Sequence, residues 1–123
     1  MTKILSSANS VMTNMIRIDA IVPQNDIRAI SDALKKINVG GITIMKVRGR
    51  GKTAGPALHA AKGTETFIPE FSDKYIVTVI VEEKDEDEAV TIIRNNTKIG
   101  KIFMYKLSRA VDIDTGAENE KAI

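Results

Sequence analysis

The sequence contains no cysteine, no tryptophan and a single histidine, His59, among its 123 residues. The missing cysteines exclude disulfides, thiolate nucleophiles and zinc–thiolate sites, and one histidine cannot build a conventional transition-metal cage. Aromatic residues form only 4% of the chain, too few to indicate a sheet that stacks RNA bases. The longest apolar run, residues 76–81 with one threonine inside it, is far shorter than the roughly 20 residues that cross a bilayer. These absences leave a globular domain for which no metal site is predicted.

The charges are nearly balanced, because lysine and arginine exceed aspartate and glutamate by only 18 to 16. Such a balance does not suit a protein that neutralises a long nucleic-acid tract. The basic residues gather in two short groups, within residues 46–52 and 98–106, which favours phosphate binding at a pocket. Residues 1–14 are polar and lack the apolar centre of a secretory signal. We therefore expect a flexible extension over residues 1–14, a single domain over residues 15–123 and a cytoplasmic location.

The spacing of apolar residues predicts the element order β-α-β-β-α-β. Strands are predicted at residues 15–22, 42–47, 74–81 and 102–107, with one more short strand at 110–113. The first helix follows Pro23, has Asn25 or Asp26 as its N-cap, and ends at the Gly40-Gly41 pair. The second helix begins in the acidic run of residues 83–88. This order indicates an α+β protein with the ferredoxin-like βαββαβ fold.

A long loop of about two dozen residues, without helical or strand periodicity, separates the second and third strands. Loops of this length are uncommon in small domains and usually bind something. Its Gly51-Lys52-Thr53 suggests a phosphate loop, but that pattern needs glycine at position 46, where Lys46 stands. What remains is a cationic strand end with glycines, which suits either close approach to an anion or a solvated turn.

The apolar and ionisable residues of this loop leave two interpretations open. Phe67 and Phe71 stand on either side of Pro69. They either pack the base of the loop against the rest of the domain or form an apolar contact site for a partner protein. His59 has no acid or hydroxyl partner at a suggestive spacing. No catalytic residue is therefore predicted.

Several motifs together resemble the PII signal-transduction proteins. They are Lys46-Val47-Arg48-Gly49-Arg50-Gly51 at a strand end, the long loop after it, Gly100-Lys101-Ile102-Phe103, and an ending with Asp114-Thr115-Gly116 and Ala122-Ile123. The likeness covers residues 15–123. It implies a regulatory protein that is not an enzyme, a homotrimer whose subunit clefts bind ATP or ADP. Its long loop, called the T-loop, would change shape on nucleotide binding and dock onto transporters or enzymes.

The resemblance also implies roles for individual residues. Contacts with the nucleotide are implied for Ile21, Thr43, Gly49, Gly51, Lys52, Lys74, Ile80, Gly100 and Lys101. Contacts with a partner protein are implied for the loop, where we single out Arg50, His59, Phe67 and Phe71. Among the first group, Thr43 and the apolar Ile21 and Ile80 correspond to the adenine slot.

Three departures from the family pattern bear on the ligand. The loop from Thr97 to Lys101 is shorter than the phosphate-holding B-loop of the family, so it offers fewer backbone donors. Asp112 and Asp114 stand where the family carries two arginines, and each lost charge-assisted contact is typically worth about 1.5–3 kcal/mol. Thr53 replaces a glutamine that helps to bind magnesium and 2-oxoglutarate. Magnesium binding therefore stays open, and sensing of 2-oxoglutarate is not predicted.

Two functions stay open on the sequence. In the first, a trimeric energy sensor without a prosthetic group binds ATP, ADP or AMP and regulates a partner, for which an amino-acid or polyamine transporter is the expectation. In the second, a binding module of the same fold has lost ordinary ATP binding and responds to another small anion or nucleotide, which the two aspartates favour. A small hydrolase of this fold is disfavoured, because the sequence shows no arginine–asparagine pair to hold an anion and a water.

Overall fold

The computed structural model of the chain describes residues 14–39, 41–51, 58–59, 66–67 and 70–123. Four strands form one antiparallel sheet in the order β2-β5-β1-β6. These strands are β1 (Met15–Val22), β2 (Thr43–Gly49), β5 (Ser72–Glu82) and β6 (Lys101–Lys106). Helices α2 (Ile27–Lys35) and α3 (Glu86–Asn95) each follow a short 3-10 helix, η1 (Gln24–Asp26) and η2 (Glu83–Asp85). The ferredoxin-like prediction is confirmed.

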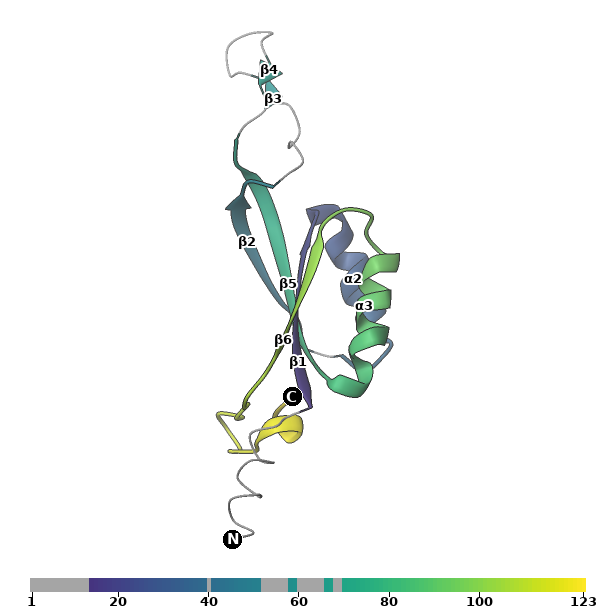
Figure 1. Cartoon of the computed structure of the whole chain (residues 1–123), viewed down its shortest axis with the longest axis vertical. Coiled ribbons are helices and arrows are strands. Elements are labelled where there is room, and N and C mark those ends of the chain that lie inside the picture. The colour runs from purple at the N-terminus through teal and green to yellow at the C-terminus, as the bar shows by residue number, and fades with distance from the viewer. Residues whose placement is uncertain (1–13, 40, 52–57, 60–65, 68–69) are drawn as a thin grey trace.

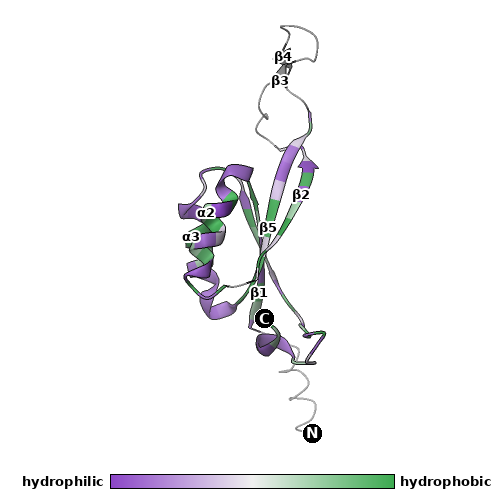
Figure 2. Ribbon diagram, turned by 180° about the vertical axis from the view of Figure 1, so that it is seen from behind, coloured by the Kyte–Doolittle hydropathy of each residue, from purple (hydrophilic) through white to green (hydrophobic). Residues whose placement is uncertain are grey.

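Both helices lie on the same face of the sheet, and no helix from the described residues covers the opposite face (Figure 1). The apolar side of each helix is turned toward the sheet, as the hydropathy colouring in Figure 2 shows. The core between these two layers consists of alternate strand residues and inner helix residues: Ile16, Ile18, Ala20, Val22, Val77, Val79, Val81, Ile30, Leu34, Ala89 and Ile93. The alternation on β1 is imperfect, since Met15 and Asp19 are also buried, but it is regular enough that the bounds of that strand, residues 15–22, were predicted correctly.

Helix α2 ends at Lys35, earlier than the predicted Gly40-Gly41 pair. Asn38 adopts a φ of +68°, and the N–H of Val39 donates to the carbonyl of Leu34 at 3.2 Å, which closes the helix end. Asparagine tolerates this left-handed conformation better than most residues. Gly41 follows the turn, and Gly40 lies outside the described residues.

Asp26 stands at the N-cap position of α2, in agreement with one of the predicted alternatives, but its side chain acts elsewhere. Its side chain makes no capping hydrogen bond. One carboxylate oxygen, Oδ2, accepts a hydrogen bond of 2.8 Å from the hydroxyl of Thr97. A residue expected to act locally therefore ties the start of α2 to the loop that precedes β6.

Two further differences concern the long loop and the C-terminus. The loop contains a short antiparallel pair, β3 (Leu58–His59) with β4 (Thr66–Phe67), which lies beyond the ends of β2 and β5 (Figure 1). The strand predicted at 110–113 is wrong, since that stretch makes only the single bridge Val111↔Glu118. The chain reverses there and ends in η3 (Asn119–Ala122). No helix in the described part of the chain is long and apolar enough to cross a membrane.

Candidate functional site

A pocket of about 600 Å³ lies along the edge strand β6, between that strand and the C-terminal part of α3. We name it the edge pocket. Its lining combines apolar residues with three cations: Val22, Val90, Arg94, Thr97, Lys98, Ile99, Gly100, Lys101, Ile102 and Met104. Its volume falls within the range of about 300–1,000 Å³ that is typical of small-ligand sites. The mixture suits a ligand with both an anionic and an apolar part.

The loop of residues 96–100 shapes this pocket through side-chain contacts. The Asn96 side-chain amide donates to the carbonyl of Ile92 at 2.8 Å, which satisfies an acceptor at the end of α3. The Thr97 hydroxyl lies 2.8 Å from Oδ2 of Asp26 and 3.2 Å from the carbonyl of Ile99. Its single proton serves one acceptor at a time, and the carboxylate is the stronger one. Thr97 therefore anchors the loop to the start of α2.

Gly100 occupies a position that no other residue fits. Its φ is +132°, and a methyl group built on it would lie 1.9 Å from the carbonyl oxygen of Ile21. The backbones of β1 and of the loop before β6 thus approach each other more closely than a side chain allows. Ile21 pairs directly with Lys101 in the sheet. The structure therefore brings together three of the predicted nucleotide residues: Ile21, Gly100 and Lys101.

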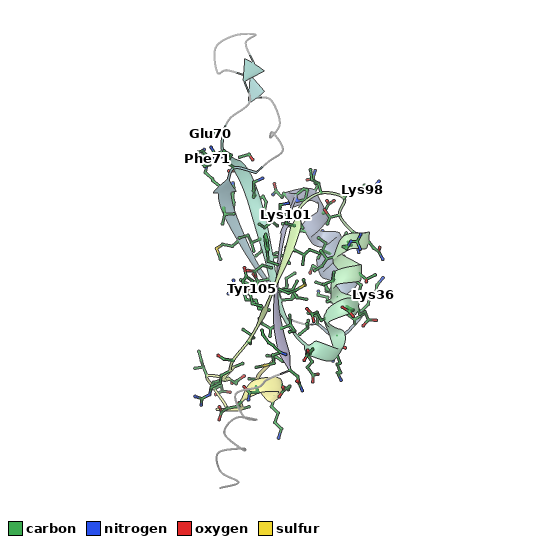
Figure 3. The ribbon with its side chains drawn as sticks, in the orientation of Figure 1. Lys36, Glu70, Phe71, Lys98, Lys101 and Tyr105 are labelled. Carbon is green, nitrogen blue, oxygen red and sulfur yellow. The ribbon has the colours of Figure 1, made fainter. Side chains whose placement is uncertain are left out.

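The cations of the edge pocket have no acidic partner in the described part of the chain. Arg94, Lys98 and Lys101 are exposed, and none of them takes part in the ion pairs found among the described residues. Lys98 and Lys101 lie on either side of the loop that leads into β6 (Figure 3). Unpaired cations around a close backbone turn create a positive potential that favours an anion.

Other predicted nucleotide residues lie on the face of the sheet that the helices leave bare. Thr43, Lys74 and Ile80 alternate onto this open face, together with Ile21. Ile80 and Lys74 are half-buried, whereas Thr43 on the edge strand β2 is exposed. Thr43 pairs with Thr78, which lies two residues before Ile80 on the same face of β5. The structure places these residues on one surface without enclosing them.

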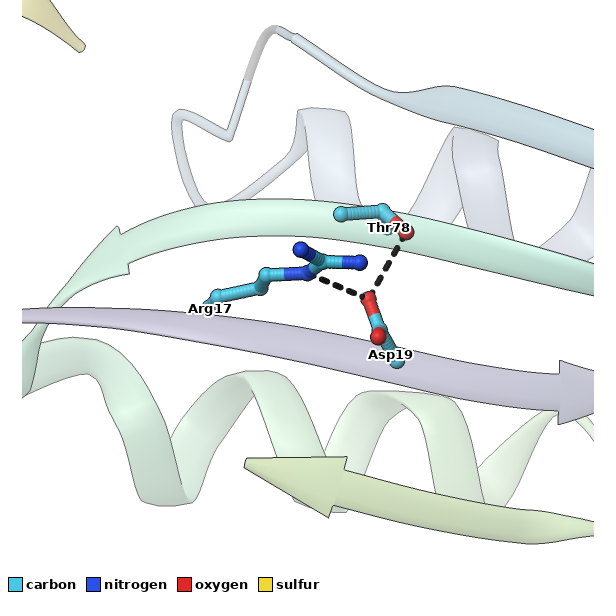
Figure 4. Close-up of polar contacts among 3 residues, drawn as sticks. All are labelled: Arg17, Asp19 and Thr78. Atoms are coloured by element: carbon cyan, nitrogen blue, oxygen red, sulfur yellow. Dashed lines mark hydrogen bonds and ion pairs between the residues drawn. The ribbon is translucent and has the colours of Figure 1, made fainter. Parts of the chain in front are cut away.

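The open face holds a polar network that the sequence did not reveal. Oδ1 of Asp19 accepts hydrogen bonds from Nε of Arg17 at 3.0 Å and from the Thr78 hydroxyl at 2.8 Å (Figure 4). Asp19 is only 7% exposed, and its hydrogen bond raises the pKa of Arg17 above its ordinary value. The Arg17 guanidinium also lies 5.4 Å from the centre of the Tyr105 ring. The only sequence signal for this network is the Arg-x-Asp spacing on a strand, which places both side chains on one face.

The roots of the long loop are held together by contacts between β2 and β5. A methyl group on Gly49 would lie 3.3 Å from the Lys74 side chain, so these two predicted residues are neighbours. Arg50 donates to Glu70 at 2.8 Å, and Phe71 beside it is 47% exposed (Figure 3). Gly51 is described and exposed, whereas Lys52 lies outside the described residues. For His59 and Phe67, the structure describes the backbone pairing alone.

The C-terminal turn of residues 112–116 carries the two aspartates that depart from the family pattern. Oδ1 of Asp112 accepts the backbone N–H groups of Asp114 and Thr115, each at 2.9 Å. These bonds, led by the one from Thr115, lower the pKa of Asp112. The backbone carbonyl of Asp112 also accepts from Gly116 at 2.9 Å. Asp112 therefore builds its own turn, a role that an arginine could not fill.

Comparison with known proteins identifies the family. The sequence pattern of the family described as Nitrogen regulatory protein P-II matches residues 15–117. The chain belongs to the PII family. It is 32% identical over 114 residues to the Nitrogen regulatory protein P-II of Haemophilus influenzae, with 89% of this chain and 100% of that one covered. Identity to Nitrogen regulatory protein P-II 1 of Escherichia coli K12 is also 32%, with the same coverage.

Solved PII structures share the fold. A structure of Arabidopsis thaliana PII bound to citrate has a TM-score of 0.72 and 25% identity, covering 90% of this chain and 94% of that one. Bacillus subtilis GlnK has a TM-score of 0.71 and 21% identity, covering 89% and 98%. At that identity the second likeness shows the fold alone.

Membership of the PII family confirms that this chain is a regulatory signalling protein rather than an enzyme. It also confirms the resemblance drawn from the motifs at residues 46–51 and 100–103. The nucleotide contacts listed by residue above stay predictions, and so do the partner contacts of the loop.

Proposed function

We propose that this PII protein is an energy sensor that binds ATP or ADP between the subunits of a homotrimer and signals occupancy through the loop between β2 and β5. The observation that carries the proposal is the group of cations Arg94, Lys98 and Lys101 around the close turn at Gly100, which form no ion pair with any residue that the structure describes. Phosphate oxygens would satisfy these cations and the backbone N–H groups of the loop. The half-buried Ile21 and Ile80 on the open face would give the adenine an apolar surface.

The trimer is part of the proposal because the open face leaves large apolar side chains uncovered. Met45, Phe103 and Tyr105 are 52%, 44% and 49% exposed on that face. Phe103 and Tyr105 are neighbours on this face of β6, and exposed apolar groups of this size favour association. A closed ring of copies would cover the same surface on each chain. Light scattering should then give three times the 13.5 kDa mass of one chain.

Nucleotide binding is tested by titration calorimetry with ATP, ADP and AMP. Replacing Lys101 with alanine should weaken binding of ATP by roughly 10- to 150-fold, the equivalent of one charge-assisted contact of about 1.5–3 kcal/mol. Lys36→Ala is the matched control, because Lys36 is equally an exposed lysine but lies at the end of α2 (Figure 3). Absence of any binding up to millimolar nucleotide would overturn the proposal.

The proposal also includes a partner protein that docks on the long loop between β2 and β5. Phe71 and the Arg50–Glu70 ion pair stand at the base of a loop that projects from the sheet (Figure 1). A protein partner would dock on this projection, and a cytoplasmic regulator of an amino-acid or polyamine transporter fits the nitrogen-regulatory family. Pull-down from membranes with and without ATP tests it, with Phe71→Ser as the variant that should abolish capture.

A second function is a binding module that takes a small anion other than a nucleotide. The observation in its favour is the pair Asp112 and Asp114, which supply no positive charge to a phosphate. A PII protein of Arabidopsis thaliana was solved bound to citrate, so a tricarboxylate is a suitable probe. Calorimetric binding of citrate without binding of any adenine nucleotide would favour this function over the first.

A further inference from the structure

The edge pocket has an apolar wall that the proposed adenine surface does not include. Ile102 and Met104 of β6 line the pocket and pair with Ala20 and Ile18, whose side chains lie in the core beneath the helices. Directly paired residues share one face of a sheet, so Ile102 and Met104 face the helices, whereas the proposed adenine surface lies on the open face. We name this part of the pocket the helix-side wall, which consists of Val22, Val90, Ile102 and Met104.

The helix-side wall is apolar and only partly covered. Val22 is buried, Val90 and Ile102 are half-buried against the core, and Met104 at the far end is 45% exposed. None of these four side chains carries a hydrogen-bond donor. The thioether of Met104 is flexible and polarisable, so it adapts to the shape of an apolar ligand. A hydrocarbon chain lying on this wall would remove its exposed apolar surface from water.

Positive charge gathers at one end of the helix-side wall. Arg94 follows Val90 by one helical turn on α3, so both residues lie on one side of the helix. Lys98 stands in the loop that joins the end of α3 to the start of β6, and the two elements run in opposite directions (Figures 1 and 3). Arg94 and Lys98 therefore lie where β6 begins, and Met104 lies farther along the strand. A ligand that fits has an anionic head and an apolar tail.

The length of the wall sets the length of the tail. From Lys101 to Met104, β6 advances by three residues, which is roughly 10 Å at about 3.3 Å per residue. An extended chain of single bonds advances about 1.2 Å per bond, as the extended backbone does over its three bonds per residue. A straight chain of about eight carbons therefore reaches from the cations to Met104.

We infer that the helix-side wall binds a free medium-chain fatty acid, with its carboxylate at Arg94 and Lys98 and its alkyl chain along Ile102 and Met104. Arginine and lysine donate charge-assisted hydrogen bonds to a carboxylate, and the wall provides the contact for the chain. The inference goes beyond the proposed nucleotide function. Because phosphate would use the same two cations, the fatty acid and ATP exclude each other, and this competition alone rests on the proposed function.

Calorimetry with straight-chain carboxylates tests the chemistry of the site. Butanoate, hexanoate and octanoate are titrated below the concentrations at which they form micelles. Each added CH2 group should tighten binding by up to about fourfold, because it is buried on the wall. Octylamine has the same chain with a cationic head and should bind at least about tenfold more weakly than octanoate. An affinity independent of chain length, or octylamine binding as tightly as octanoate, would overturn the inference.

Two variants and one spectroscopic probe place the ligand. Met104→Ser should weaken octanoate binding by at least about fivefold, the contribution of slightly more than one buried CH2 group. Ile44→Ser is the matched control, because Ile44 is 48% exposed and faces the helices from β2, at the opposite edge of the sheet. With isotope-labelled methionine methyl groups, octanoate should shift the NMR signal of Met104 and leave that of Met45, on the open face, unchanged. Equal losses in the two variants, or a Met104 signal that does not move, would refute binding at this wall.

Saturating ATP tests the competition and should weaken octanoate binding severalfold, whereas an unchanged affinity for octanoate would reject the competition. The two proposals fail separately. ATP binding in a protein that binds no octanoate rejects the fatty-acid site alone. Octanoate binding at Met104 in a protein that binds no adenine nucleotide rejects the proposed function alone.

Discussion

Replacing Gly100 with alanine tests whether the close approach of two backbones fixes the edge pocket. The new methyl group would lie 1.9 Å from the carbonyl oxygen of Ile21, and the φ of +132° is one that alanine rarely adopts. The backbone must therefore shift. The shift disturbs the pair of Ile21 with Lys101, at the end of the ladder between β1 and β6.

The expected cost of this substitution follows from these two effects. An unfavourable backbone conformation costs about 1–3 kcal/mol, and each weakened ladder hydrogen bond adds roughly 0.5–1.5 kcal/mol. Gly100→Ala should lower the free energy of unfolding by about 3 kcal/mol. This is a large part of the roughly 5–15 kcal/mol that stabilises a typical domain.

Urea unfolding followed by circular dichroism measures this loss. Protein concentration must be held constant, because assembly couples stability to concentration. Gly41→Ala is the matched control, since a methyl group there has no atom within 4 Å and the backbone is not left-handed. The control should change stability by no more than about 1 kcal/mol. If Gly100→Ala lost no more than Gly41→Ala, the argument from close approach would be refuted.

Three further predictions address the loop, the turn and the open face. Thr97→Val removes the donor to Asp26 and should cost about 1–2 kcal/mol in urea unfolding, whereas Thr97→Ser should cost much less; equal losses would contradict the hydrogen bond. The pKa of Asp112 in the folded protein lies below its ordinary value of 3.8, so the Asp112 carboxylate stabilises the fold fully above pH 3.8 and loses this effect as the pH falls through the folded pKa. An NMR titration of Asp112 with a midpoint at or above 3.8 would disprove this prediction. Tyr105→Asp on the open face should reduce the mass in light scattering to that of one chain, whereas the control Ile44→Ser, on the other face of the sheet, should leave the mass unchanged. If the Tyr105→Asp variant kept the assembled mass, the open face would be excluded as the interface.

The sequence predicted the layers of the fold because apolar periodicity is a local property. The alternation of apolar residues on β1 gave both its bounds and its covered face. Helix ends were predicted less well, because several residues near an end can close it. Gly40 and Gly41 looked like the terminator of α2, but Asn38 adopts the left-handed conformation first. The stretch 110–113 has strand-like composition, yet the side chain of Asp112 holds a turn there.

By itself, the sequence determined the ferredoxin-like order, the PII family and the importance of the segment from Thr97 to Lys101. Only the tertiary structure decided what that segment does. Thr97 meets Asp26 across 71 positions of sequence, and Gly100 meets Ile21 across a sheet edge. Likewise, no local pattern could show that the cations beside Gly100 have no acidic partner among the described residues. Contacts between distant segments depend on how helices and strands pack, and spacing along the chain carries no record of them.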